Sequence, residues 1–477
     1  MPGAPRDLLS EDDLARLEGA VRHILTRVGV LIQSERLLRA LQAHGARVDG
    51  ATQRALIPEA LLEAVIAERK GQAARHPAEP PRAVSGDYRI GVESHVAQFY
   101  LDPGTGERRA AGRDDFLTLV HFGDAWDESL AVDHVLLLRE EPPLIEPLEA
   151  LALLLEHARR PGDVYAHYAE QFPYLAEIGE IVAGDRTRFL RGGIFMVSPL
   201  RMDKRAADFM AARSDLGLSS GVGTQPVAGA SAPVTAAGAI AQGAAEILAG
   251  WCAQYALNPT LDLAGSICSG ALDMAAGNVA FCSPETMLQD VGCVEFFRRR
   301  CGGGVGVAGG SDYTSAKVPG LQAAFEKTVE AMGIAMYTGR PMRMGSGLLE
   351  SGKTFSPQQF ILDQELGSFL WAMERGVEVS EDTLALEAVA SVGSGIGASH
   401  LETEHTLRHF RDLWQPRLLD RAVRKDDAWE AQADRRLLER ATRRFHDVLA
   451  QYRPPEVDRE MLRRVRTVVD RARNELL

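Results

Sequence analysis

The sequence has few cysteines and no long apolar run. Its five cysteines are few, and odd in number, for a disulfide framework in a chain of 477 residues. No apolar run reaches the roughly 18 residues of a membrane-spanning helix. The start, MPGAPRDLLSEDDLARLEG, lacks the basic and apolar regions of a secretory signal. We therefore expect a cytoplasmic protein without a membrane partner.

The sequence also lacks an excess of basic residues. Lysine and arginine number 53 against 66 aspartates and glutamates, which gives a formal net charge of −13. Proteins that bind nucleic acid usually carry a positive patch or stripe, because the phosphate backbone is anionic. We therefore do not expect nucleic acid as a partner.

A glycine-rich run, CGGGVGVAGGSD, contains the pattern G-x-G-x-x-G at residues 304–309. A dinucleotide-binding turn needs a strand before this pattern and a helix that begins inside it. Here the preceding residues, FFRRRC, end a predicted helix, and Pro319 interrupts the stretch that follows. We expect no bound nucleotide, and we interpret the run as a tight strand whose missing side chains leave room.

The sequence changes character along its length. Residues 1–80 have helical apolar periodicity, 81–112 combine glycine and proline with the alternating stretch HVAQFYLDP, and 451–477 predict a C-terminal helix. Over residues 113–450, short apolar stretches alternate with helical ones. This alternation predicts an α/β fold: a TIM-type (β/α)8 barrel with an N-terminal helical region, or alternatively a doubly wound sheet.

Serine–proline pairs indicate where several helices begin. A serine hydroxyl can cap the first turn, and the proline that follows already has a helical φ angle. The pairs are Ser198-Pro199, Ser283-Pro284 and Ser356-Pro357. Gln359 lies three residues after Ser356 and predicts a capping box there.

The clustered cysteines raise the question of a metal. They are Cys252, Cys268, Cys282, Cys293 and Cys301. No C-x-x-C pair is present, so most of these thiols are expected to be small buried side chains. If zinc were bound, Cys268 would be its first candidate ligand, because it follows a predicted strand. His405 and His409 have the i, i+4 spacing of a helical metal site, but a polar helix face produces this spacing by chance; we expect no metal.

Two polar groups lie in elements predicted to be buried. His167 stands at the end of a predicted strand beside Tyr165, Tyr168 and Glu170, a group with acid–base or cation-binding potential. Glu246 is the lone carboxylate of a helix rich in small residues. It must be paired, neutralised or exposed at an interface.

A series of stretches spans most of the chain in a particular order. They are LEGAVRHILTRVGVLIQSERLLRALQAHGARVDGATQRALIPEALLEAVIA, FYLDPGTGERRAAGRDDF, GASAPVTAAGAIAQGAAEILAG, SGLLESGKTFSPQQFILDQEL, GVEVSEDTLALEAVASVG, EHT and PRLLDRA. Read in order, they resemble the trimethylamine methyltransferase superfamily. Several independent motifs in one order are far more specific than any one of them.

The resemblance implies a TIM-type barrel, in agreement with the strand–helix alternation. It also implies transfer of a methyl group from a methylated amine to the Co(I) of a corrinoid (cobalamin) on a separate partner protein. A quaternary ammonium leaves as a neutral tertiary amine, so such an enzyme chiefly positions its small methylated substrate in a dry cavity. We also expect a homo-oligomer.

The end of the glycine-rich run departs from the family pattern. The pyrrolysine of the trimethylamine enzymes stands just before a Ser-Asp pair, and the corresponding residue here resembles Gly310. The resemblance therefore favours the non-pyrrolysine branch, which includes demethylases of glycine betaine and similar quaternary amines. The family's compact Ser-Asp-Ala-Lys run is interrupted here by Tyr313-Thr314-Ser315. Tyr313 would enlarge the loop at the pocket mouth, so the substrate is expected to differ from those of characterised relatives.

A quaternary ammonium pocket needs aromatic faces and a carboxylate. Aromatic residues make up only 6% of the chain, but several lie near predicted strands. The residues expected to be catalytic are Asp312, Glu350 and His167. Those expected to bind the substrate are Tyr100, Tyr168, Phe195, Gln225, Gly310 and Tyr313.

Two alternatives stay open at this point. The first is a family member that acts on a thioether, sulfonium or methoxy compound, in which Cys268 and other groups hold zinc to activate the leaving group. The second is a non-catalytic barrel that keeps the fold and binds a ligand.

Overall fold

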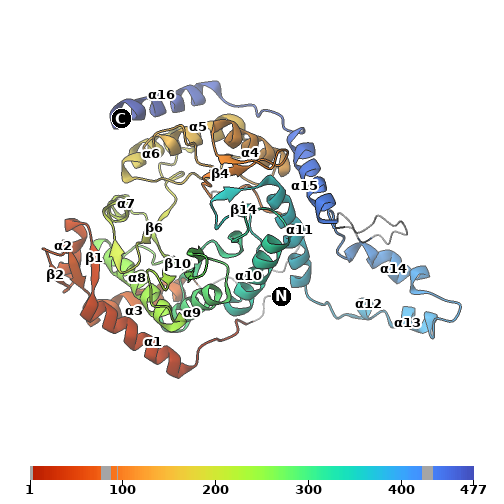
Figure 1. The fold of residues 1–477 in the computed structure, drawn as a ribbon, viewed down its shortest axis with the longest axis horizontal. Coiled ribbons are helices and arrows are strands. Elements are labelled where there is room, and N and C mark those ends of the chain that lie inside the picture. Colours follow the sequence, from red (N-terminus) through yellow and green to blue (C-terminus); the bar gives the residue numbers. More distant parts are fainter. Residues whose placement is uncertain (1–3, 77–87, 94, 420, 422–432) are drawn as a thin grey trace.

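The structure is a computed structural model that describes residues 4–76, 88–93, 95–419, 421 and 433–477. Its α/β body is surrounded by N-terminal and C-terminal helices (Figure 1). The expected boundary between residues 1–80 and 81–112 lies outside the described residues. No described helix is both long and apolar enough to cross a membrane.

The N-terminal region combines the expected helices with three short strands. They are α1 (Glu11–His23), α2 (Glu35–Ala43), α3 (Glu59–Arg75), β1 (Val30–Ile32), β2 (Arg47–Asp49) and β3 (Arg54–Leu56). The three helices pack against α8 (Ala236–Leu257), and β1 pairs in parallel with β7 (Arg201–Met202). The N-terminal region is therefore attached to the body through both a helix and a strand.

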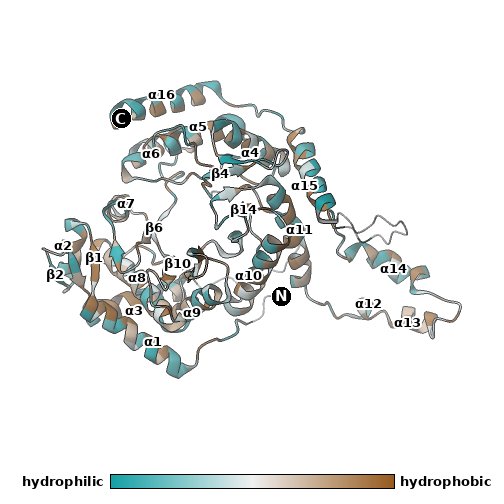
Figure 2. Ribbon diagram, in the orientation of Figure 1, coloured by the Kyte–Doolittle hydropathy of each residue, from teal (hydrophilic) through white to brown (hydrophobic). Residues whose placement is uncertain are grey.

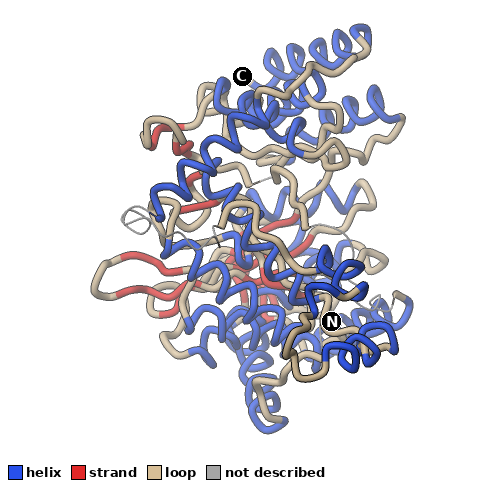
Figure 3. Tube along the Cα trace, turned by 90° about the vertical axis from the view of Figure 1, so that its right-hand side faces the viewer, coloured by secondary structure: helices blue, strands red, loops and turns tan. Residues whose placement is uncertain are grey.

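Helices α4 to α11 follow one another around a ring in Figure 1, with short strands on its inner side. The other helices of the ring are α4 (Arg113–Trp126), α5 (Glu146–His157), α6 (Phe172–Ala183), α7 (Lys204–Asp215), α9 (Pro284–Arg300), α10 (Leu321–Thr338) and α11 (Pro357–Glu374). The strands are β4 (Phe99–Leu101), β5 (Arg108–Ala110), β6 (Gly193–Met196), β8 (Gly221–Thr224), β9 (Val227–Ala228), β10 (Gly265–Ile267), β11 (Gly270–Asp273), β12 (Asn278–Ala280), β13 (Val305–Val307), β14 (Leu348–Leu349) and β15 (Thr354–Phe355). The side view of Figure 3 shows how short these strands are beside the helices.

A parallel sheet in the order β6–β8–β10–β13 confirms the predicted strand–helix alternation. Two apolar stretches of this alternation, residues 131–138 and 163–172, form only a few strand-like backbone hydrogen bonds. Ala97 bridges Leu136, and Val132 bridges Pro161. Regular pairing therefore does not close into a barrel over the described residues.

The predicted helix caps are confirmed at two of three positions. The hydroxyls of Ser283 and Ser356 accept hydrogen bonds from the first turns of α9 and α11. The prediction for Ser198 is wrong, because α7 begins at Lys204 and is capped by Asp203. The predicted capping box at Ser356 is incomplete, since the Ser356 N–H donates to the Gly347 carbonyl oxygen and not to the Gln359 side chain.

The hydroxyl of Ser198 instead satisfies the buried carboxylate of α8. Glu246 accepts hydrogen bonds from Ser198 Oγ at 2.7 Å, the Leu200 N–H at 2.9 Å and Gln242 Nε2 at 3.0 Å, and also from the Thr224 hydroxyl. Of the three states expected for Glu246, the structure shows the first, because the carboxylate is paired through hydrogen bonds. The pairing connects α8 to the ends of β6 and β8.

After α11 the chain forms a projection over residues 376–412, which we call the arm (Figure 1). It contains α12 (Glu381–Leu384), α13 (Leu386–Val392) and α14 (Glu404–His409). The chain then returns as α15 (Ala433–Leu449), against α4 and α11, and as α16 (Arg459–Leu476), against α5 and α6. Figure 2 shows alternating hydrophilic and hydrophobic residues along α16, as expected for the predicted C-terminal helix.

A fully buried ion pair joins α10 to α11. Lys327 Nζ lies 2.6 Å from Asp363 Oδ2, and neither side chain is exposed. Asp363 also accepts hydrogen bonds from the Gly347 N–H at 2.8 Å and from Gln359 Nε2 at 2.6 Å. Removing one member of such a pair leaves an uncompensated charge in the interior.

We predict that Lys327→Met lowers the free energy of unfolding by about 3–5 kcal/mol, because Asp363 loses its counter-charge. Urea denaturation followed by circular dichroism measures the change. Lys204→Met is the matched control, since it removes an ion pair with Asp208 whose lysine is 77% exposed. That control should change stability by less than about 1 kcal/mol. Equal effects of the two substitutions would contradict the prediction.

Candidate active site

The inner face of the parallel sheet carries small side chains. The register places Phe195, Gly223, Ser266 and Gly306 side by side on adjacent strands. Their neighbours Ile194, Val222 and Val305 are buried on the opposite face, as the alternation of a strand requires. Two glycines and a serine therefore leave space inside the ring, and the Phe195 ring lies over Gly223 and is 44% exposed.

Two of the predicted residues meet just beyond the ends of these strands, two residues after Gly223 and Ser266. Gln225 follows β8 and Cys268 follows β10, and Gln225 Nε2 lies 3.7 Å from Cys268 Sγ. Gln225 is exposed, whereas Cys268 is buried, and burial raises the pKa of its thiol. A buried neutral thiol is a poor nucleophile and a poor metal ligand.

The end of β13 is shaped by glycines and one aromatic ring. Gly310 has a φ of +39° and begins the short 3-10 turn Gly310–Asp312. The Tyr313 ring packs between Gly309 and Gly352, where an added Cβ would come within 2.1 and 2.3 Å of ring atoms. Both positions have positive φ angles, so glycine suits them on two counts. The Phe281 ring lies 6.0 Å from that of Tyr313.

The residues that interrupt the Ser-Asp-Ala-Lys run are held by α10. Glu326 accepts hydrogen bonds from Thr314 Oγ1 at 2.6 Å and from the Ser315 N–H at 2.7 Å. Cys282 Sγ lies 2.8 Å from the carbonyl oxygen of Tyr313. Tyr313, Thr314 and Ser315 are therefore held in place beside Asp312.

Asp312 belongs to a cluster of titratable groups. Side-chain atoms of Glu93, His95 and Asp312 all lie within 4.8 Å of one another. His95 Nε2 is hydrogen-bonded to the Ser346 hydroxyl, and Glu93 forms an ion pair with Arg343.

The protonation states of this cluster follow from burial and from Lys327. Burial raises the pKa of Asp312 to about 6, although the Lys327 charge opposes it. Burial lowers the pKa of His95 to about 4, and the Lys327 charge acts in the same direction. Near neutral pH, Asp312 is therefore mostly ionised beside an uncharged imidazole.

A cavity of about 570 Å³ extends from Asp312 along β13. Its wall includes Tyr88 and Trp371, whose ring centroids are 5.9 Å apart, and Arg340. The Arg340 guanidinium lies against Gly306, where an added Cβ would be 2.6 Å from Nη1. No carboxylate of the described residues forms an ion pair with Arg340. The cavity thus offers a carboxylate, two aromatic rings and a guanidinium to one molecule.

His167 is held by a buried carboxylate. Glu146 Oε1 lies 2.8 Å from His134 Nε2, and Glu146 Oε2 lies 3.2 Å from His167 Nε2. Burial alone would raise the pKa of Glu146, but the charge of His134 and hydrogen bonds from both histidines lower it to about 2. Gln171 Oε1 accepts the backbone N–H groups of His167 and Tyr168 at 2.7 and 2.9 Å. This arrangement orients the His167 ring 5.9 Å from that of Tyr165.

Glu350 and Tyr100 contact a different set of neighbours. The Glu350 carboxylate binds Arg108 and Thr354 beside the turn between β14 and β15. Tyr100 is 3% exposed, and the Arg109 guanidinium lies 5.1 Å from its ring centroid. These contacts occupy both side chains, and neither residue lines the cavity at Asp312. Their predicted roles in the site stay predictions.

Two groups of three potential metal ligands occur among the residues that the structure describes. One is the Asp312 cluster, and the other is Asp382, His405 and His409 in the arm. Neither contains Cys268, and the five cysteines form no disulfide. The described residues therefore give a zinc site at Cys268 no support.

Residues 347–354 match the phosphate-binding pattern G-x-x-x-x-G-K-[ST]. A phosphate loop joins a strand directly to the start of a helix. Here the segment is the turn of an antiparallel hairpin, with Leu349 paired to Thr354, and α11 begins only at Pro357. The local fold excludes a phosphate loop.

Sequence reasoning missed Glu93, His95 and Arg340. His95 begins the alternating stretch HVAQFYLDP, so its position before a predicted strand was an available signal. No sequence signal pointed to Arg340, because this residue follows a helix in a segment without regular strand pairing. It reaches the site only through its contact with Gly306.

Comparison with known proteins supports one family along nearly the whole chain. The trimethylamine methyltransferase (MTTB) family profile matches residues 2–476. Trimethylamine methyltransferase MttB of Desulfitobacterium hafniense (strain DSM 10664 / DCB-2) is 23% identical over 98% of this chain and 94% of its own length. Glycine betaine methyltransferase of strain Y51 of that species is 23% identical, with 95% of each chain covered.

One further relative matches over a shorter stretch, and one solved structure is similar over most of the chain. Trimethylamine methyltransferase MttB of Methanosarcina barkeri (strain Fusaro / DSM 804) is 28% identical over 64% of each chain. The crystal structure of the Methanosarcina barkeri monomethylamine methyltransferase covers 91% of this chain and 92% of its own, with 13% identity and a TM-score of 0.42. The family match extends over the N-terminal region, the ring and the C-terminal helices alike. The chain belongs to the trimethylamine methyltransferase (MTTB) family.

Proposed function

We propose that this methyltransferase demethylates a quaternary amine of the betaine type and passes the methyl group to the Co(I) of a corrinoid on a partner protein. Family membership supports methyl transfer from a methylated amine, and one relative is named for glycine betaine. The observation that carries the choice of substrate is the cavity that contains both Asp312 and Arg340.

A betaine carries a quaternary ammonium and a carboxylate on one small molecule. Asp312 offers negative charge to the ammonium, and Tyr88 and Trp371 offer aromatic faces to the same cation. Arg340 offers a guanidinium to the carboxylate. Trimethylamine lacks a carboxylate, so it would leave Arg340 unused.

In this proposal the protein acts mainly by positioning and by electrostatics. The Co(I) of the corrinoid would supply the nucleophile for the methyl carbon, and the carbon–nitrogen bond would break to release a neutral tertiary amine. Asp312 stabilises the bound cation, and Arg340 fixes the other end of the molecule so that one methyl group is presented. His95, uncharged and held by Ser346, keeps the cluster from gaining positive charge. Phe195 and Gln225 are exposed near the ends of β6 and β8, so the corrinoid protein could approach the site from there.

We also propose that the ring is a TIM-type barrel. The order of helices α4 to α11 around the inner strands supports this architecture (Figure 1). The parallel bridges Ala97–Leu136 and Val132–Pro161 support it as well, because both involve residues 131–138, an apolar stretch of the predicted alternation.

The proposed reaction is tested with purified protein, reduced cobalamin or a corrinoid protein, and a panel of methylated compounds. Glycine betaine should consume Co(I) and give the absorbance of methylcobalamin, whereas trimethylamine should not. Arg340→Gln should raise KM for glycine betaine by roughly tenfold or more, because a charge-assisted hydrogen bond is lost. Its KM for tetramethylammonium, which has no carboxylate, should not change.

Arg16→Gln, at a side chain that is 81% exposed on α1, is the control for loss of an arginine. Turnover of trimethylamine but not of any betaine would overturn the proposed substrate. Turnover of a sulfonium or methoxy compound alone would favour the alternative of a family member with a different methyl donor. No methyl transfer at all would favour a non-catalytic barrel that binds a ligand.

The pKa of Asp312 predicts how activity depends on pH. Burial raises this pKa to about 6, so the carboxylate gains a proton as the pH falls through that value. The site then loses its charge for the ammonium, and kcat/KM for glycine betaine should fall about tenfold per pH unit below it. The His95 pKa, about 4, lies below this range. The Asp312→Asn variant should be slow at all pH values, and its kcat/KM should not fall further as the pH is lowered. If the fall at low pH persists in this variant, another group causes it.

We further propose that the chain forms a homo-oligomer through the outer face of α10. Leu321, Phe325 and Val329 are 81%, 66% and 46% exposed, and their spacing places them on one helix face. Light scattering should give a mass at least twice the 51.8 kDa of one chain. Phe325→Glu should shift the protein towards the monomer, whereas Gln42→Glu, at an exposed position of α2, should not. A monomeric parent protein would overturn this proposal.

A further inference from the structure

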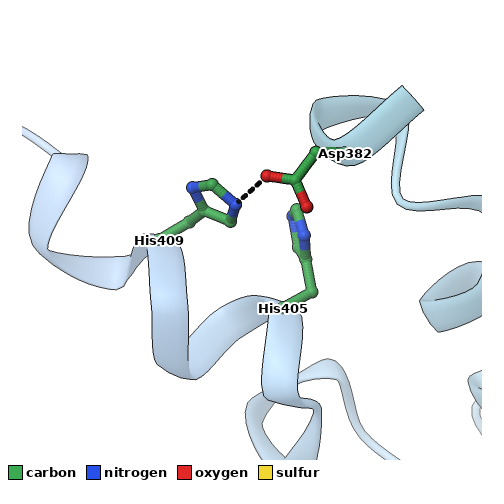
Figure 4. Close-up of side chains that lie close together, drawn as sticks. All are labelled: Asp382, His405 and His409. Carbon is green, nitrogen blue, oxygen red and sulfur yellow. Dashed lines mark hydrogen bonds and ion pairs between the residues drawn. The ribbon is translucent and has the colours of Figure 1, made fainter. Parts of the chain in front are cut away.

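We propose that the arm binds one divalent transition-metal ion of the zinc class, with Asp382, His405 and His409 as ligands. Figure 4 shows the three side chains directed towards a common point, Asp382 from α12 and both histidines from α14. Their ligand atoms all lie within 4.8 Å of one another. This site is separate from the cavity at Asp312, and the inference does not depend on the proposed function.

The geometry suits a metal. Asp382 Oδ2 lies 3.0 Å from His409 Nε2, and the His405 and His409 ring centroids are 4.5 Å apart. Nδ1 of His405 is buried and has no hydrogen-bond partner among the described residues. Zinc binds such atoms at about 2.0–2.2 Å, so its tetrahedral ligands lie slightly more than 3 Å apart. A small inward movement of His405 would bring the three ligand atoms to this spacing.

The surrounding groups orient the ligands as a metal site requires. His409 Nδ1 lies 3.0 Å from Asp412 Oδ2, so a carboxylate fixes the ring from its far side. Arg408 Nη1 lies 2.8 Å from Asp382 Oδ1, which leaves Oδ2 to face the histidines. Two imidazoles and one carboxylate are donors that zinc accepts readily, whereas calcium and magnesium prefer oxygen ligands alone.

The arm also needs a cross-link. Its helices α12, α13 and α14 have 4, 7 and 6 residues, and none has a buried residue. All five cysteines lie outside residues 376–412, so no disulfide can form within the arm. Segments shorter than about 40 residues seldom bury enough apolar surface to hold a shape without a metal, a disulfide or a partner. A metal between Asp382 and His405 would join the two ends of the arm.

The test uses untagged, full-length protein treated with a chelator and then titrated with Zn²⁺ against a chromophoric competitor. We expect one zinc per chain. His409→Gln and His405→Gln should each weaken zinc binding by roughly 100-fold or more, and Asp412→Asn by about 10- to 100-fold, since it only orients His409. Zinc should also slow proteolysis within the arm of the parent protein.

The controls separate this site from other histidines. His23→Gln, at an exposed position on α1, should bind zinc like the parent. His95→Gln tests the second possible cluster and should also leave zinc binding unchanged. Circular dichroism of each variant checks that the body remains folded. A parent protein that binds no stoichiometric zinc, or a site lost in His95→Gln but kept in His409→Gln, would overturn the proposal.

Discussion

Lys327 and Asp363 are both fully buried, and each charge is tolerated there because the other is present. The pair joins α10 to α11, and Asp363 also holds the Gly347 N–H just before β14. The same lysine charge acts on the candidate site: it limits the rise of the Asp312 pKa that burial causes and helps to keep His95 uncharged. The buried pair therefore helps to fix the segment before β14, and its lysine acts together with burial on the protonation state of the site.

The missing side chains of the glycine-rich run explain how the site fits inside the ring. Gly306 leaves room for the Arg340 guanidinium on the inner face of β13, and Gly309 leaves room for the Tyr313 ring at the end of that strand. A larger residue at either position would meet those side chains at less than 3 Å. Glycine thus lets two large polar or aromatic groups approach the backbone beside Asp312, which is a steric role and not a nucleotide-binding one.

Local signals predicted local features well. Ser283 and Ser356 cap their helices because a hydroxyl before a first turn needs only its own neighbours. A carboxylate buried in a helix of small residues needs hydrogen-bond donors, and Glu246 receives them from Ser198 and Leu200. Ser198 caps no helix because α7 begins only at Lys204, and its hydroxyl instead donates to that same carboxylate, 48 residues away. A tertiary contact overrode the local preference, and the sequence around Ser198 carries no sign of it.

The sequence by itself determined the family, through motifs in a particular order, and the alternation of strands and helices, through apolar periodicity. It also placed Asp312 and Tyr313 at the end of a strand. Only the tertiary structure decided which groups surround them. His95 meets Ser346 across 251 residues of sequence, and Arg340 meets β13 without pairing to it. Periodicity reports which face of an element is buried, but the partners of that face depend on how distant elements pack.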